Sequence, residues 1–166
     1  MRKLLWISLV PALFLFVTIN AQGGESFGTL SVRATAAVTC VVSSKTLNFG
    51  DYTGAAMRVS ETTAVQCTAG TPYTISYGPG DNFNETRRMV SIELEPPSFL
   101  IYGLECASEE LGDINQECGD GIIGGPPING IGTGLVQQFP VDAYLNSNQF
   151  VEAATYEDSV LITVSY

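Results

Sequence analysis

The chain contains 166 residues, of which 45% are hydrophobic and 14% are charged, and it contains no histidine. Its 7 basic and 17 acidic side chains give a net charge of −10, so it lacks the positive surface that binds nucleic acid or anionic lipid. The length suits one domain with a substantial core. Without histidine, Ser-His-Asp and Cys-His catalysis and His-ligated metal sites are excluded. We therefore expect no enzyme activity, no cofactor, no small-molecule substrate and no nucleic-acid partner.

The first residues have the layout of a secretory signal peptide. A basic start, Met1-Arg2-Lys3, precedes an apolar run from Leu4 to Ile19, and small residues follow. We predict a signal peptide over residues 1–21 with cleavage after Ala21, or alternatively after Gly23 or Gly24. A retained N-terminal anchor is the alternative, but the run is short for a membrane span. The rest of the chain is then exported.

Export makes the four cysteines candidates for disulfides. Of the three possible connectivities, we prefer Cys40–Cys67 together with Cys106–Cys118. The first pair joins two predicted strands, and the second closes a short acidic loop. A zinc site is the alternative, but the chain has no CxxC pair and no histidine.

The chain after residue 25 shows the alternation of β-strands. From Leu30 to Cys40 every even position is apolar, which predicts a long strand with one buried face. Further strands are predicted at 63–67, 73–77, 89–94, 99–104, 139–145 and 160–166, separated by Gly and Pro clusters. This pattern is typical of an all-β sandwich, without a helix longer than one turn. The Gly-rich residues 119–134 are predicted to be a long loop.

Two groups of acidic residues could carry other functions. Residues 113–117 read D-x-N-x-E like the start of a calcium loop, but Cys118 stands where such a loop has Gly, and no Glu follows at the twelfth position. A solvated, disulfide-closed loop over 105–121 is the alternative, and the sequence does not define its role. Glu93 and Glu95, on one face of a predicted strand, could suggest a glycosidase, but an acidic edge explains them better.

Several motifs, in their order and spacing, resemble the spore coat U domain family, whose better understood members are pilin subunits of archaic chaperone–usher pili. The resemblance covers nearly all of the chain after the signal and rests on Cys40-Val41-Val42-Ser43, Asn48-Phe49-Gly50-Asp51-Tyr52, Val65-Gln66-Cys67-Thr68, Gly70-Thr71-Pro72-Tyr73, Arg88-Met89, Leu100-Ile101-Tyr102, Gly132-Thr133-Gly134, Tyr156-Glu157-Asp158-Ser159-Val160 and Val164-Ser165-Tyr166.

The resemblance implies an incomplete immunoglobulin-like β-sandwich that lacks its last strand. Residues 22–34 would be a donor-strand segment, and residues 35–166 the pilin domain. The donor side chains would be Phe27, Leu30, Val32 and Ala34. The edge of the acceptor groove would be formed by Val160, Ile162, Val164 and Tyr166, where the chain stops without a closing strand.

The function that the resemblance implies is a structural subunit of a surface pilus, polymerised by donor-strand exchange and supporting adhesion and biofilm formation. Its partners would be neighbouring subunits, a periplasmic chaperone and an outer-membrane usher. The subunit would pass through the periplasm to the cell surface. The alternative is a stand-alone secreted coat or binding domain that keeps its N-terminal strand for itself.

Overall fold

The computed structural model describes residues 23–106 and 116–166. The predicted signal peptide, residues 1–21, lies outside the described residues. The chain divides into two units, Met1–Thr35 and Ala36–Tyr166. In the first unit, residues 23–35 form no strand and their side chains are exposed. No helix in the described part of the chain is long and apolar enough to cross a membrane.

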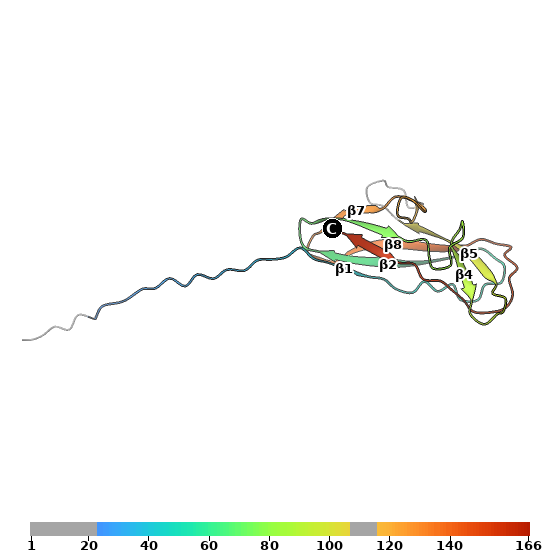
Figure 1. Cartoon of the computed structure of the whole chain (residues 1–166), viewed down its shortest axis with the longest axis horizontal. Coiled ribbons are helices and arrows are strands. Elements are labelled where there is room, and N and C mark those ends of the chain that lie inside the picture. The colour runs from blue at the N-terminus through green and yellow to red at the C-terminus, as the bar shows by residue number, and fades with distance from the viewer. Residues whose placement is uncertain (1–22, 107–115) are drawn as a thin grey trace, which may run out of the picture. The chain divides into compact units, whose positions relative to one another are not determined.

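The second unit is built from antiparallel strands, and its described residues contain no helix. The strands, shown in Figure 1, are β1 (Cys40–Ser43), β2 (Met57–Cys67), β3 (Pro72–Tyr77), β4 (Arg88–Ser91), β5 (Phe99–Cys106), β6 (Gln116–Glu117), β7 (Ile128–Ile131), β8 (Gln137–Leu145), β9 (Tyr156–Glu157) and β10 (Ile162–Ser165).

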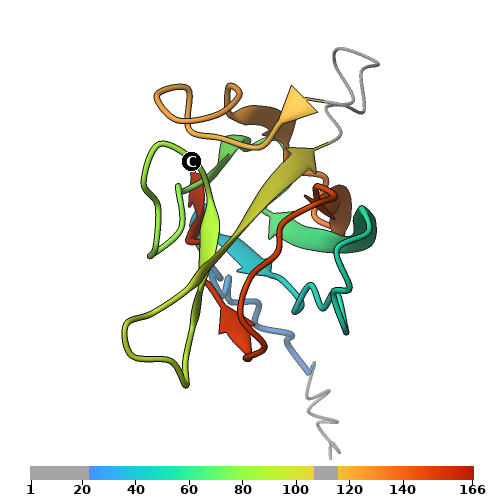
Figure 2. The same cartoon turned by 90° about the vertical axis from the view of Figure 1, so that its right-hand side faces the viewer.

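These strands form two sheets, seen from one end in Figure 2. The larger sheet has the order β1-β2-β8-β5-β4-β9, with β6 paired to β5. The smaller sheet has the order β10-β3-β7. In the smaller sheet Ile162 lies opposite Tyr77, and Val164 lies opposite Ile75. Because β10 ends this order, its other edge has no strand partner among the described residues.

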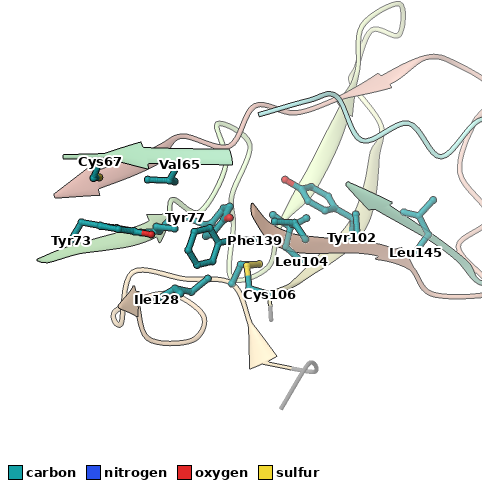
Figure 3. Packing of buried hydrophobic residues seen from close by; sticks show 14 of the residues in the cluster. Val65, Cys67, Tyr73, Tyr77, Tyr102, Leu104, Cys106, Ile128, Phe139 and Leu145 are labelled. Atoms are coloured by element: carbon teal, nitrogen blue, oxygen red, sulfur yellow. A yellow bond between two sulfur atoms is a disulfide. The ribbon is translucent and has the colours of Figure 1, made fainter. Parts of the chain in front are cut away.

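The core lies between the sheets because alternate side chains of the long strands point the same way. In β8, Phe139, Val141, Ala143 and Leu145 are buried while the residues between them are more exposed. Figure 3 shows Phe139 of β8 beside Tyr73 and Tyr77 of β3. The rings of Tyr73 and Phe139 meet edge to face, with centroids 6.4 Å apart, a favoured arrangement of aromatic pairs.

Three features of the structure differ from the sequence-based expectations. The alternating run from Leu30 is not a strand: among its residues only Cys40 belongs to one, the first residue of β1. An extended segment becomes a strand only when it pairs with a sheet edge. The predicted loop over 119–134 contains β7, which pairs with β3. Glu93 and Glu95 follow β4 and do not share a strand face.

Candidate functional site

The most prominent cavity of the second unit lies between residues 44–49 and the chain around β10. It has a volume of about 840 Å³. Its walls include the apolar side chains of Leu47, Phe49, Met89, Val160 and Ile162. These side chains are only partly buried and pack against the core. The cavity therefore exposes apolar surface that an ordinary sandwich would cover with another strand.

The floor of this cavity belongs to the core itself. Leu104 of β5 and Val141 and Ala143 of β8 are each at most 5% exposed, and all three line the cavity. The wall at β10 is the strand edge without a partner among the described residues. An open edge beside an apolar floor can accept an extended segment, which adds main-chain hydrogen bonds and places alternate side chains in the cavity.

A polar network closes one end of the cavity, where Asp158 precedes β10. The Asp158 carboxylate accepts hydrogen bonds from the Tyr102 hydroxyl at 2.6 Å and from the Asn82 backbone N–H at 3.1 Å. Burial raises the pKa of Tyr102, and the hydrogen bond to Asp158 raises it further. The phenol therefore stays protonated at neutral pH and remains a donor. The network ties residues 80–82 to the start of β10.

A second cavity of about 600 Å³ shares Leu47, Phe49, Met89 and Tyr156 with the first. Its far wall is held by Tyr52, whose hydroxyl donates to the Asn146 carbonyl at 2.6 Å and accepts from the Gln149 N–H. These bonds fix the segment around Tyr52 to the loop that follows β8. The two cavities therefore form one groove, which we call the open groove, lined by residues 44–54 and 149–162.

Of the four residues predicted to form the groove edge, two line the open groove and two do not. Val160 and Ile162 line the open groove. Val164 packs against the core and does not line either cavity of the groove, and Tyr166 is exposed beyond the end of β10. The predicted donor residues Phe27, Leu30, Val32 and Ala34 belong to the other unit and are exposed.

The sequence analysis did not predict that residues 44–54 form a wall of the open groove. Their signal was present, since Leu47 and Phe49 alternate with polar residues just after β1. The alternation is too short to distinguish from a loop. The role of Leu47 and Phe49 becomes visible only in the fold, where they line the same cavity as Val160.

Both disulfides have the connectivity that the sequence analysis preferred. Cys40 of β1 is bonded to Cys67 of β2, directly opposite it in register. Cys106 at the end of β5 is bonded to Cys118. The second bond is supported by the buried Arg87, whose guanidinium donates to the Cys118 carbonyl at 2.9 Å.

The acidic residues provide no assembled site in the described part of the chain. No group of three or more metal-ligating side chains comes together there. Asp113 and Asn115 of the calcium-like pattern lie outside the described residues. Hydrogen bonds from the side chain of Thr155 and from its N–H hold the pKa of the Glu93 carboxyl below the usual value. This carboxylate fixes a turn near the second cavity.

Comparisons with known proteins identify a family from the sequence and a related fold from a solved structure. A model of the Spore Coat Protein U domain matches residues 26–163. A search of curated proteins found no match. Among solved structures, the chain is similar to one in the CsuC–CsuE chaperone–tip adhesion subunit pre-assembly complex from archaic chaperone–usher Csu pili of Acinetobacter baumannii. The TM-score is 0.56 and the identity 24%, over 80% of this chain and 40% of that chain.

A second solved structure, described as a chaperone–tip adhesin complex in CFA/I fimbriae biogenesis, has a TM-score of 0.46 and 16% identity, over 73% of this chain and 38% of that chain. The chain thus spans less than half the length of the solved chains that it matches.

Proposed function

Because the chain belongs to the Spore Coat Protein U domain family and has an incomplete immunoglobulin-like β-sandwich fold, we propose that it is a structural subunit of a surface pilus. Subunits polymerise by donor-strand exchange through a chaperone–usher pathway, and the pilus supports adhesion and biofilm formation. The subunit is exported through the periplasm to the cell surface. The observation that carries this proposal is the open groove beside the unpaired edge of β10.

The groove suits an extended occupant. A strand beside β10 would satisfy the backbone groups of that edge and bury the half-exposed Leu47, Phe49 and Ile162. Each fully buried aliphatic or aromatic side chain contributes about 1.5–3 kcal/mol. Left open, such an edge favours aggregation. The proposal therefore includes two further partners. A periplasmic chaperone fills the groove first, and the neighbouring subunit replaces the chaperone at an outer-membrane usher.

The occupant in the polymer is the N-terminal segment of a neighbouring subunit, residues 22–34. Leu30, Val32 and Ala34 share one face of an extended chain, because side chains alternate with a period of two. Phe27 is three positions before Leu30 and lies on the opposite face of an uninterrupted strand. It reaches the groove only through a bulge. We therefore assign the main anchoring role to Leu30 and Val32.

A peptide titration tests this proposal. The full-length Leu30→Asp variant, whose own segment cannot fill a groove, is mixed with synthetic peptides of residues 23–36. The unchanged peptide and its Ser31→Asp version are expected to bind, while a Leu30→Asp peptide binds at least about tenfold more weakly, because it would bury an unpaired charge. If the unchanged peptide and the Leu30→Asp peptide bound equally or not at all, the stand-alone domain would be the better account.

A further inference from the structure

In the described part of the second unit, four segments without a charged side chain meet at one end, although the chain carries a net charge of −10. This neutral end comprises residues 36–43, 66–73, 129–137 and 165–166, none of which is Asp, Glu, Lys or Arg. Register and hydrogen bonds bring these segments together: Val41 lies opposite Gln66, Pro72 opposite Ile131, and Ser165 opposite Thr74. Figure 1 shows the C-terminus near β7 at this end.

The neutral end also exposes apolar side chains. More than half of the surface of each of six residues is exposed: Val38, Val41, Ile131, Leu135, Val136 and Tyr166. Single exposed apolar residues are common on protein surfaces, but a group of them without a neighbouring charge is typical of the central part of a protein interface. Charged residues, in contrast, line the open groove, among them Asp81 and Glu157.

The loop that carries Leu135 and Val136 is held in place by hydrogen bonds. The Gly132 N–H donates to the Thr71 carbonyl and the Gly70 N–H to the Gly132 carbonyl, both at 2.7 Å. The Gln66 side chain donates to the Gly134 carbonyl at 2.9 Å. A Cβ at Gly132 would collide with the Thr68 carbonyl oxygen. The apolar side chains are thus presented by an ordered backbone, which lowers the entropy cost of binding a partner.

A short connection joins this end to the proposed donor segment. Thr39 is fixed by its N–H, which donates to the Thr68 hydroxyl, and by its carbonyl, which accepts from the Thr68 N–H. Five residue steps separate Ala34 from Thr39, and they span at most about 18 Å. A neighbour whose groove holds Leu30 to Ala34 must therefore lie close to the neutral end.

We propose that the neutral end is a second interface between subunits, and that it packs against the copy of this chain whose groove holds its N-terminal segment. This inference rests on the proposed function. The contact joins a surface without charged side chains to an acidic molecule, which reduces the repulsion between two surfaces of charge of the same sign. Donor-strand insertion then supplies the link between subunits, and the neutral end limits their relative motion.

Variants separate this contact from strand insertion. The double variant Leu135→Asp/Val136→Asp is compared with Ile122→Asp, which places a single carboxylate at a position that is 90% exposed and outside the neutral end. The double variant is expected to form polymers that dissociate about tenfold faster in urea than those of the wild type or Ile122→Asp. When either change is combined with Leu30→Asp, which keeps the groove free, binding of the 23–36 peptide is expected to be unchanged.

Amide hydrogen exchange tests the second interface without any substitution in the neutral end. Residues 38–43 and 132–137 are expected to be more protected in wild-type polymers than in the Leu30→Asp monomer with the 23–36 peptide in its groove. Equal exchange in the two forms, or equal dissociation of the double variant and Ile122→Asp polymers, would overturn the second interface while leaving donor-strand exchange intact. Failure of the peptide to bind and of the wild type to polymerise would overturn the proposed function and this inference together.

Discussion

Individual polar residues determine where the open groove ends. Asp158 accepts hydrogen bonds from the Tyr102 hydroxyl and from both the backbone N–H and the side-chain amide of Asn82. A carboxylate beside an apolar cavity is stable only when its oxygens are satisfied in this way. From the sequence alone Asp158 looks like an ordinary surface acid, because its sequence neighbours do not reveal the three hydrogen-bond donors around its carboxylate.

Removing the Tyr102 hydroxyl is expected to destabilise the domain. In Tyr102→Phe the Asp158 carboxylate loses its shortest hydrogen bond, so the free energy of unfolding should fall by about 1.5–3 kcal/mol, as for hydrogen bonds to charged groups. Urea unfolding measures this change. Tyr166→Phe is the control, because Tyr166 is 62% exposed. Equal stability of the two variants would show that the network does not hold the start of β10.

Acid should weaken the turn at Asp120. Its carboxylate accepts from the Ile122 and Ile123 N–H groups at 2.8 Å each, which lowers the pKa of Asp120. This contribution to stability is present above the unfolded pKa of about 3.9 and is lost as the pH falls through the lower folded pKa.

Asp120→Ala should therefore have a lower melting temperature than the wild type at pH 6, and the difference should shrink below about pH 4. Melting curves from pH 6 to pH 2 test this, with Glu25→Ala in the exposed N-terminal segment as the control. A difference that stayed constant over the whole range would contradict the assignment.

At the scale of elements, the sequence predicts the buried strands better than the edges. The alternation in β3, β5 and β8 is strong because each strand has one face in the core. The short β7 lies within residues 119–134, which the sequence predicts to be a loop because they are rich in glycine. The structure shows why residue 130 is a glycine: a Cβ there would collide with the Tyr73 ring. Residues 30–39 have a strand pattern but pair with no strand among the described residues; in the proposal, residues 30–34 pair with a neighbouring subunit instead.

The two disulfides should differ in their importance for folding. Each closes a loop whose restriction is worth about 3–3.5 kcal/mol in the chain-entropy model. β1 pairs only with β2 and has four residues, so Cys40–Cys67 is its main additional anchor. Cys118 is also held by Arg87 and by its N–H bond to the Leu104 carbonyl.

We therefore expect Cys40→Ser/Cys67→Ser to lower the yield of exported protein strongly, and Cys106→Ser/Cys118→Ser to lower it less. Quantification of the exported folded protein tests this order. The reverse order would show that β1 is held by its neighbours alone.

Gly132 should be intolerant of a side chain. In Gly132→Ala the new Cβ would meet the Thr68 carbonyl and the Cys67 side chain, so the loop must move and stability should fall by about 1–3 kcal/mol. Gly23→Ala, where no atom lies within 4 Å of a Cβ, is the matched control. Thermal unfolding measures both, and an unchanged midpoint for Gly132→Ala would mean that the loop adapts freely.

At the scale of the molecule, the second unit exposes two different apolar surfaces, the open groove and the neutral end. The open groove exposes side chains that pack against the core, while the neutral end exposes apolar side chains that are not part of the core. Alternation in the sequence predicts the sandwich, and the family resemblance predicts a groove edge of which Val160 and Ile162 line the open groove. The sequence could not predict the cavity or the neutral end, since both arise from segments that are distant in the chain and meet only in the fold.

The most direct measurement of the central claim is the size of the assemblies formed by full-length variants with one charge placed on either face of the N-terminal segment. Leu30→Asp would bury an unpaired charge in a neighbour's groove, which costs several kcal/mol, whereas Ser31→Asp keeps its charge on the other face. Our account predicts polymers for the wild type and Ser31→Asp and only single subunits for Leu30→Asp, by size analysis and electron microscopy. Long polymers of Leu30→Asp, or of a chain lacking residues 22–33, would contradict it.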